Sequence, residues 1–365
     1  MTTNASLTLR ELRVRAVQVP LRLPLQTSGG TVRVAPLALI DLVTEQGVTG
    51  RAYLFCYTPL ALKPVVQLLQ NLSEFLKGDA VAPLEIDQKL QRTFRLLGAT
   101  GLTAIAMAGI DMAAWDAQAR AAGLPLARLL GGTLRRVPAY NSCGLGIIGA
   151  ARAAAEAAEL IEPGFTGVKV RLGYPDLNTD VEVVRAVRRA IGEGIHLMSD
   201  YNQTLSVAEA LRRCEALRGE GLAWIEEPTR ADDHEGHAQI RRKAGVPIQI
   251  GENWWGPHDM AKSIAAGSCD LGMPDAMKIG GVTGWMRAAA LGEAAGMPIS
   301  SHLFPEISAH LLAVSPTMHW LEYVDWAEPI LQTSLRIEKG DAVIADVPGS
   351  GIEWDEGAVK RLQMT

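Results

Sequence analysis

The chain has 365 residues and a formal net charge of −5 at pH 7, with 48% hydrophobic and 21% charged residues. This composition is typical of a globular protein with a large core, and it excludes a disordered chain. The negative net charge gives no electrostatic reason to expect nucleic acid as a partner. A chain of this length usually forms about two to three domains.

The sequence shows no segment of the kind that enters or crosses a membrane. The N-terminus, MTTNASLTLR, lacks the apolar core of a secretory signal. The most apolar region, residues 101–130, is interrupted by Asp111, Asp116 and Arg120. We therefore expect a cytoplasmic protein without a membrane partner. Its four cysteines, which we expect to be reduced, show neither metal-site spacing nor a disulfide pattern: Cys56, Cys143, Cys214 and Cys269.

The first part of the chain predicts strands followed by helices. The pair Gly29-Gly30 marks a loop over about residues 25–33, between the first two strands. Strands and helices that do not alternate predict a separate α+β domain over residues 1–132. Its expected strands lie at 9–19, 35–43 and 48–55, and its expected helices at 60–76, 86–97 and 102–121.

From residue 137 onward, short apolar runs alternate with amphipathic helical patterns. Eight parallel strands with helices between them predict a barrel over residues 133–326, with functional groups at the strand C-termini. We expect residues 327–365, which break this rhythm, to pack back on the first domain. The predicted helices include 151–160, 180–190 and 207–217. The predicted strands end near Ser142, Arg171, Asp200, Glu226, Glu252, Asp275, His302 and Glu322.

Three acids end successive strands of this predicted barrel. Asp200 ends the run IHLMSD, Glu226 follows LAWI and Glu252 ends PIQIGE, at equal intervals of 26 residues. Each acid alone is better explained as a helix cap or a partner of a surface base. Three carboxylates at one rim repel each other unless a divalent cation neutralises them. Their hard oxygen ligands favour Mg²⁺, with Mn²⁺ as a substitute.

Lys169 and Arg171 lie two residues apart on one predicted strand, so both project to the same face. Inside a barrel these two cations can both contact one anionic substrate. The alternative is that Lys169 and Arg171 are ordinary solvated cations. A lysine crowded by a second cation and a metal has a lowered pKa and can act as a base.

His302 and Asp275 end neighbouring predicted strands, so the acid can orient the imidazole and raise its basicity. The alternative is a structural histidine without a catalytic role. Glu322 ends the last predicted strand, where it can stay protonated in a dry, anionic site and donate a hydrogen bond to substrate. Lys278, three residues after Asp275, is expected to help set the charge of the site.

These residues together resemble the enolase superfamily, and within it the mandelate racemase subgroup. The similarity runs nearly from end to end. Its motifs are YLFCYTP (53–59), GIDMAAWDA (109–117), DYNQ (200–203), WIEEPT (224–229), GENW (251–254), MPDAMKIGGVTGW (273–285), SSHLF (300–304), EISAHLLA (306–313) and HWLE (319–322).

The resemblance implies an α+β capping domain, a modified (β/α)₇β barrel and a homo-octamer that acts on a small 2-hydroxycarboxylate. It implies that the loop at 25–33 closes over the side group of the substrate. It implies that Asp200, Glu226 and Glu252 bind Mg²⁺ and that Glu322 is an acid opposite the metal. It implies that Lys169 contacts the substrate carboxylate, that Asn202 contacts the substrate hydroxyl, and that Ser142 and Tyr57 lie near the substrate. It also implies that His302, with Asp275, is the base facing the (R) enantiomer.

One departure from the subgroup concerns the second base. Where the subgroup has a second lysine facing the (S) enantiomer, this chain has Arg171. A guanidinium group has a pKa above about 12 and is a poor general base at neutral pH. A second departure is the loop, where Gly29, Gly30 and Arg33 are small or polar although a phenyl ring would need apolar cover. Arg33 suits a polar or acidic substrate instead.

Three functional hypotheses follow. In the first, which the near-complete similarity favours, Arg171 still moves a proton and the chain is a racemase or epimerase that forms an enediolate from a 2-hydroxycarboxylate. In the second, Arg171 acts only electrostatically and His302 is the sole base, as in dehydratases of acid sugars (aldonates and aldarates). In the third, the barrel is catalytically disabled and serves binding, although the acid trio and the histidine–aspartate pair argue against this.

Overall fold

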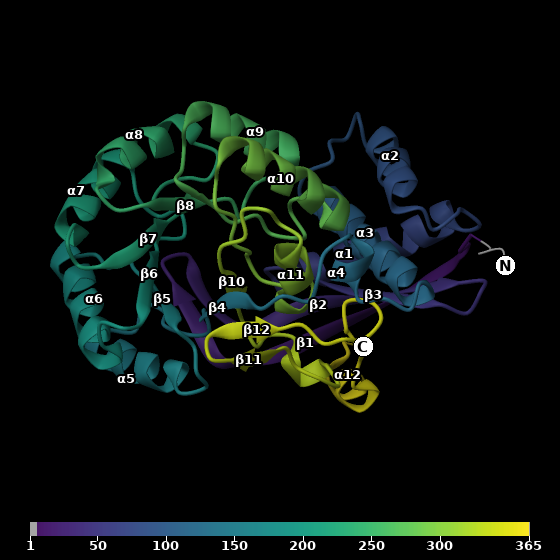
Figure 1. Cartoon of the computed structure of the whole chain (residues 1–365), viewed down its shortest axis with the longest axis horizontal. Helices are drawn as coiled ribbons and strands as arrows, with labels where there is room; N and C mark the ends of the chain where they lie inside the picture. Colours follow the sequence, from purple (N-terminus) through teal and green to yellow (C-terminus); the bar gives the residue numbers. More distant parts are fainter. Residues whose placement is uncertain (1–5, 365) are drawn as a thin grey trace.

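The computed structural model describes residues 6–364 and combines an antiparallel N-terminal sheet with a barrel of parallel strands (Figure 1). The N-terminal sheet has the order β1-β2-β3 and carries helices on one side. The predicted α/β class, a modified barrel with an α+β cap, is thereby confirmed. The N-terminal elements are β1 (Leu9–Thr27), β2 (Gly30–Thr44), β3 (Thr49–Phe55), α1 (Pro59–Leu76), α2 (Pro83–Thr93), α3 (Leu102–Ala121) and α4 (Leu126–Leu129).

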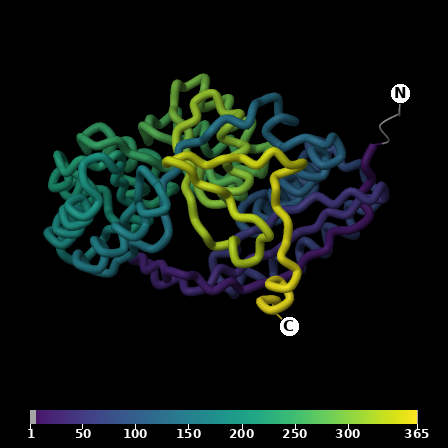
Figure 2. The backbone as a smooth tube through the Cα atoms, turned by 60° about the horizontal axis from the view of Figure 1, so that its bottom comes forward, coloured from purple at the N-terminus to yellow at the C-terminus, as the bar shows by residue number. Residues whose placement is uncertain are grey.

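The predicted loop over residues 25–33 is wrong in its extent, because most of it is strand. β1 and β2 form one long hairpin in which Thr27 pairs with Gly30, so the turn itself is only Ser28 and Gly29. The register shifts between Pro20 and Leu25, and pairing then resumes to the tip. The purple hairpin in Figure 2 extends from the N-terminal sheet to the teal part of the barrel.

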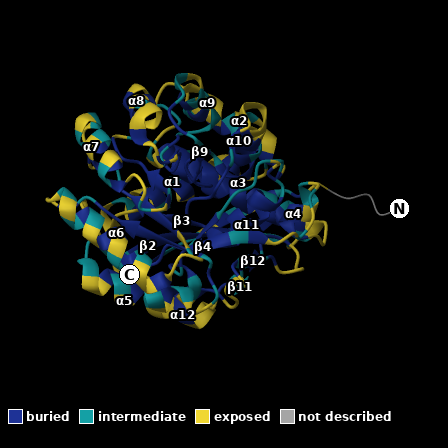
Figure 3. Cartoon of the chain, turned by 60° about the vertical axis from the view of Figure 1, so that its left-hand side comes forward, coloured by how far each residue is buried: buried dark blue, intermediate teal, exposed yellow. Residues whose placement is uncertain are grey.

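Helix α3 is buried on most of its faces between the N-terminal sheet and helix α10 (Gly281–Ala295). Figure 3 shows it in the dark blue interior, whereas the outer helices α6 to α9 alternate buried and exposed faces. Close approach to β3 requires a very small residue at Gly50. A Cβ built at Gly50 would meet the backbone oxygen of Ala113 and lie 2.6 Å from the nitrogen of Ala117.

The barrel strands run in parallel in the order β4-β5-β6-β7-β8-β9, and β10 pairs with β4 to close the ring. The segment predicted as the seventh strand joins the ring through isolated bridges, Gly272 to Ile299 and Ile299 to Met318, rather than a regular strand. The strands are β4 (Val137–Asn141), β5 (Gly167–Arg171), β6 (His196–Asp200), β7 (Leu222–Glu226), β8 (Ile248–Ile250), β9 (Leu271–Gly272) and β10 (Leu321–Tyr323).

The outer layer of the barrel consists of helices that follow the strands in the chain. The predicted helices at 151–160, 180–190 and 207–217 correspond to the first three of them within one to three residues. They are α5 (Ala150–Ile161), α6 (Leu177–Ile191), α7 (Val207–Leu217), α8 (His234–Ala244), α9 (Pro257–Ala266), α10 and α11 (Pro305–Ala313).

The interior of the barrel beneath the strand C-termini is filled by large side chains. Tyr140, Met198 and Trp224 form a buried cluster, with Trp320 packed against it. Each lies two residues before a polar residue of the predicted site, so it faces the same barrel interior one layer lower. This layer separates the predicted site from the opposite end of the barrel.

The residues after β10 contact both sheets. Strand β12 (Asp341–Val343) pairs with β4 and with β11 (Arg336–Glu338). Trp354 Nε1 donates to Asp41 Oδ1 at 2.8 Å, and helix α12 (Glu356–Leu362) packs against β1. A short 3₁₀ helix, Glu328–Ile330, precedes these elements. The division of the chain at residues 132 and 326 stays a prediction.

Among the described residues, no helix combines the length and the apolar character that crossing a membrane requires.

Replacement of Gly50 by alanine tests the contact between β3 and α3. We expect Gly50→Ala to lower the free energy of unfolding by about 3 kcal/mol, the upper end of the range for overpacked cores, because backbone atoms cannot move aside. Gly194→Ala is the matched control, since a Cβ there meets open space. Chemical denaturation of both variants measures the difference, and equal midpoints would contradict the packing described for α3.

Candidate active site

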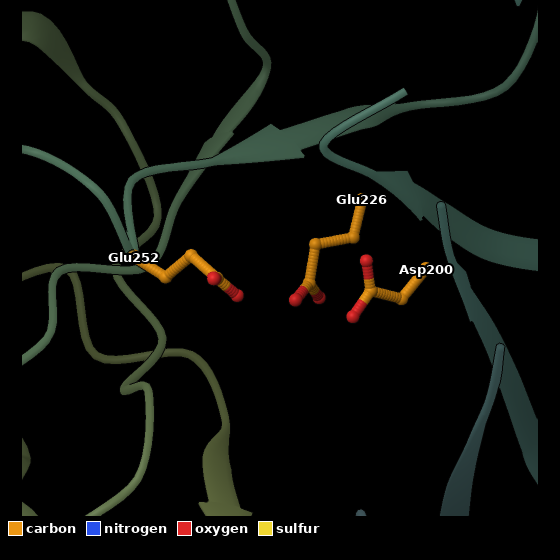
Figure 4. A group of neighbouring side chains, drawn as sticks. All are labelled: Asp200, Glu226 and Glu252. Carbon is orange, nitrogen blue, oxygen red and sulfur yellow. The ribbon is translucent and has the colours of Figure 1, made fainter. Parts of the chain in front are cut away.

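The three predicted metal ligands converge at the C-terminal rim of the barrel. Asp200, Glu226 and Glu252 each offer a carboxylate oxygen, and these oxygens lie within 4.8 Å of one another. Figure 4 shows Asp200 and Glu226 from neighbouring strand ends, with Glu252 reaching toward them from the other side. All three residues are buried. Convergent hard oxygen donors of this kind fit Mg²⁺.

Sharp backbone turns aim these side chains into the site. Asn202 and Glu227 follow the acids of β6 and β7 with φ values of 46° and 35°, in the left-handed region that few residues adopt. Gly251, with φ 136°, precedes Glu252, and a Cβ there would lie 2.7 Å from the ring of Trp254. Glycine is therefore required where the chain turns to present Glu252.

Burial and mutual repulsion raise the proton affinity of two members of the trio. Burial raises the pKa of Asp200, and it raises the pKa of Glu226 to about 8 despite the nearby Lys169. For Glu252, burial would raise the pKa, but the charges of His302 and Lys278 lower it. A divalent cation between the three oxygens would offset this repulsion.

Lys169 pairs with carboxylates on two sides of the site. Its Nζ lies 2.6 Å from Glu226 Oε1, 2.7 Å from Glu322 Oε1 and 3.7 Å from Asp200 Oδ2. Burial would lower the pKa of Lys169, but Glu226 and Glu322 hold it well above its usual value. In this arrangement the carboxylates around Lys169 favour its charged form, and the expected lowering of its pKa beside a bound metal stays a prediction.

Glu322 accepts several hydrogen bonds on the side of the site opposite the acid trio. It accepts from Ser142 Oγ at 2.7 Å, from the backbone N–H of Leu303 at 3.0 Å and from Lys169. Burial would raise the pKa of Glu322, but the charges of Lys169 and His302 hold it below its usual range. The expected protonated Glu322 is thus not the form that these neighbours favour.

His302 and Asp275 form the predicted pair. His302 Nδ1 lies 2.6 Å from Asp275 Oδ2, and its Nε2 lies 3.4 Å from Glu252 Oε2. Asp275 Oδ1 accepts the backbone N–H groups of Met277 and Lys278, which fixes the carboxylate in this orientation. Burial would lower the pKa of His302, but Glu252, Glu322 and Asp275 together raise it to about 9. Nε2 thus faces the acid trio, and the neighbouring carboxylates favour the protonated imidazole.

Arg171 is held by the loop after β4. Its Nη1 donates to the backbone oxygens of Ser142 at 2.9 Å and Gly144 at 3.1 Å, and its Nη2 donates to Ser142 Oγ at 2.9 Å. Its Nε lies 3.9 Å from Asp200 Oδ2. These contacts engage both terminal nitrogens of the guanidinium as hydrogen-bond donors.

Other predicted substrate contacts lie at the same rim. Asn202 donates from Nδ2 to Asp200 Oδ2 at 2.8 Å, and its buried Oδ1 has no hydrogen-bond partner among residues 6–364. Tyr57 is 38% exposed, with its ring 4.4 Å below the Nζ of Lys278. At the hairpin tip, the Ser28 hydroxyl bonds that of Thr204, so the hairpin reaches the mouth of the barrel.

Sequence reasoning missed several residues that orient the ligands. Trp224 Nε1 donates to Glu226 Oε2 at 3.2 Å, and Gln249 Nε2 lies 3.5 Å from the same oxygen. Trp224 precedes Glu226 by two on one strand, so strand parity offered a signal for it. Asn253 contacts both Glu227 and Glu252, which no sequence pattern indicated.

Comparisons with known proteins agree with this geometry. Residues 9–131 match the family described as mandelate racemase / muconate lactonizing enzyme, N-terminal domain, and residues 152–358 match the family described as enolase C-terminal domain-like. The L-talarate/galactarate dehydratase of Salmonella typhimurium is 33% identical over 288 residues, which cover 78% of this chain and 72% of the relative.

Two solved structures are more similar still. An enolase from alpha proteobacterium BAL199 with bound Mg²⁺ is 46% identical, with a TM-score of 0.96 and coverage of 98% of this chain and 100% of the other. An enolase from Bradyrhizobium in complex with magnesium and mandelic acid is 43% identical, with a TM-score of 0.95 and full coverage of both chains. The chain therefore belongs to the enolase superfamily, in its mandelate racemase / muconate lactonizing enzyme group, and Asp200, Glu226 and Glu252 are its Mg²⁺ site.

Proposed function

We propose that this enzyme removes the α-proton of a 2-hydroxycarboxylate with His302 as its only base, and that the overall reaction is dehydration of an acid sugar. The observation that carries the proposal is the asymmetry of the site. His302 presents a free Nε2 next to Glu252 and is oriented by Asp275. On the other side, Arg171 is engaged as a donor to backbone oxygens.

The chain's own charges prepare the site for an enediolate. An α-proton next to a carboxylate is weakly acidic, so its removal requires stabilisation of the added negative charge. Mg²⁺, when bound, supplies a Lewis acid at the substrate carboxylate. Lys169, which we place at the same carboxylate, adds a fixed positive charge in a buried site. Once the substrate shares Lys169, Glu322 loses its main counter-charge, which favours its protonation and hydrogen-bond donation.

Dehydration needs no second base. His302 takes the α-proton, and the electron pair left on C2 expels the hydroxyl group from C3. The same imidazolium returns its proton to that hydroxyl, which leaves as water. The enol product then becomes a 2-keto-3-deoxy acid. Arg171 and Asn202 would hold substrate oxygens, since Asn202 Oδ1 offers a free acceptor.

The hairpin tip supports a hydroxylated substrate. Residues 27–31 read TSGGT, and Arg33 follows, so the tip offers hydroxyl and backbone groups rather than a hydrophobic wall. A screen of aldonates and aldarates with Mg²⁺, read with a carbonyl reagent for 2-keto-3-deoxy acids, tests the proposal. Product from at least one acid sugar is expected, and a screen without product would count against dehydration.

Racemisation of a 2-hydroxycarboxylate is the second candidate. It is favoured by the similarity to the Bradyrhizobium enolase in complex with mandelic acid, which is 43% identical over the whole length of both chains. In that case Arg171 would have to accept a proton on the face opposite His302. A homo-octameric assembly stays a prediction from the family resemblance, and a cytoplasmic location stays a prediction from the sequence.

Metal binding should reverse the effect of one ligand replacement on stability. With EDTA, we expect Asp200→Asn to unfold at a higher temperature than the natural chain, because it removes repulsion within the trio. With Mg²⁺ at about 100 times its Kd, the natural chain should gain about 2.7 kcal/mol and the variant far less. Thermal unfolding under both conditions measures this. An equal Mg²⁺ effect in both proteins would place the metal elsewhere.

Replacement of the base should abolish turnover without loss of metal. We expect His302→Asn to slow product formation by about 10² to 10⁴-fold, the usual contribution of a general base. His234→Asn, outside the site, is the control. In the natural enzyme the rate should fall as the pH is lowered and His302 becomes protonated, because only the neutral imidazole accepts the α-proton; Glu322 and Asp275, which raise the pKa of His302, move this fall to higher pH. A pH-independent rate, or an active His302→Asn variant, would exclude this role.

Arg171→Lys should create a second base. A lysine amine can lose its proton beside a metal and a cation, whereas a guanidinium rarely does. With mandelate as the test compound, we expect the variant to racemise both enantiomers and the natural enzyme to racemise neither, as read by circular dichroism. If the natural enzyme racemises mandelate as fast as the variant, the racemase alternative is correct.

A further inference from the structure

Lys278 is a third cation near the metal site, besides Lys169 and Arg171. Lys278 is 5% exposed, and its Nζ donates to Asn253 Oδ1 at 2.5 Å. It lies over the ring of Tyr57, 4.4 Å from the centroid, and 5.8 Å from that of Trp255. A buried ammonium with two aromatic neighbours is costly unless it stabilises nearby negative charge.

Asn253 transmits that charge to two carboxylates. Its Nδ2 lies 3.0 and 2.8 Å from the oxygens of Glu227 and 3.2 Å from Oε1 of Glu252. The ammonium of Lys278 can only donate, so the atom of Asn253 that faces it at this distance must be the amide oxygen. It therefore fixes the amide with its N–H₂ group facing the two acids.

The orientation of Glu252 depends on this amide. With Oε1 toward Asn253, the other oxygen, Oε2, faces into the site, 3.4 Å from His302 Nε2. Glu227 is buried next to two metal ligands, and Asn253 provides its side-chain hydrogen bonds among the described residues. Without Lys278 the amide is free to turn, and an amide oxygen facing two carboxylates would push Glu252 out of position.

We propose that Lys278 is a positioning residue for the Mg²⁺ site, which acts through Asn253 to hold the ligand Glu252 and its neighbour Glu227. Because Tyr57 belongs to the N-terminal unit, the same ammonium links that unit to the metal ligand. The proposal concerns metal binding, so it stands independently of whether the reaction is dehydration or racemisation.

Titration calorimetry with Mg²⁺ alone tests the proposal, because it requires no substrate. We expect Lys278→Met to weaken Mg²⁺ binding by about 10 to 100-fold, as is usual for partners of metal ligands. Lys278→Arg should restore most of the affinity, since it still donates to the amide oxygen. Lys262→Met is the matched control, because Lys262 also carries one positive charge but its side chain is 72% exposed on α9. Unchanged binding by Lys278→Met would overturn the proposal.

A double-mutant cycle separates positioning from the effect of charge alone. If Lys278 acts through Asn253, then Asn253→Ala and the double variant with Lys278→Met should bind Mg²⁺ with nearly the same Kd. If the two losses in affinity multiply, Lys278 acts by long-range charge and the proposed role fails. The Asn253→Ala variant keeps the charge of Lys278. If Lys278→Met folds poorly, this variant alone still tests whether the amide of Asn253 is needed for Mg²⁺ binding.

Discussion

The structure depends on bringing three buried carboxylates to within 4.8 Å of one another. Their repulsion opposes folding unless positive charge is placed among them. The barrel brings the three acids together because neighbouring strands end at a common rim. A layer of large, buried side chains fills the barrel below that rim. Turns with unusual φ values then direct each acid inward. The strain at these turns is the cost of a site that is organised before the metal arrives.

Three cations approach the metal ligands from different places. Lys169 is paired with Glu226 and also lies 3.7 Å from Asp200, and Arg171 lies 3.9 Å from Asp200. Glu252 reaches its cation, Lys278, through the amide of Asn253. This separation lets the three cations do different work. Lys169 is paired with Glu226 and Glu322, Arg171 is engaged by the loop after β4, and the Nζ of Lys278 lies over the ring of Tyr57.

Much of this arrangement could be predicted from the sequence, because strand parity and a regular repeat do not depend on distant contacts. The convergence of the acid trio and the pairing of His302 with Asp275 follow from such local rules. The hairpin could not be predicted to its tip, because the ladder beyond Pro20 is fixed by pairing with β2. The ion pair between Lys169 and Glu322 was not predicted, because these residues lie about 150 positions apart in the chain.

The orientation of Arg171 was also invisible in the sequence. Its partners are backbone oxygens of the loop after β4, and any residue type can supply those. The proposal of a single base rests on that orientation. The family resemblance favours racemisation, whereas the contacts of this one side chain favour an enzyme that works from one face of its substrate.

The most direct test of a single base is proton NMR in D₂O of (R)- and (S)-mandelate, each with the natural enzyme and Mg²⁺. Mandelate has no hydroxyl group to lose at the next carbon, so proton removal is seen alone, as exchange of the α-proton. A single base at His302 predicts exchange of the (R) enantiomer with retention of its configuration. Exchange of both enantiomers, with racemisation, would show that Arg171 is a working base and would contradict the account.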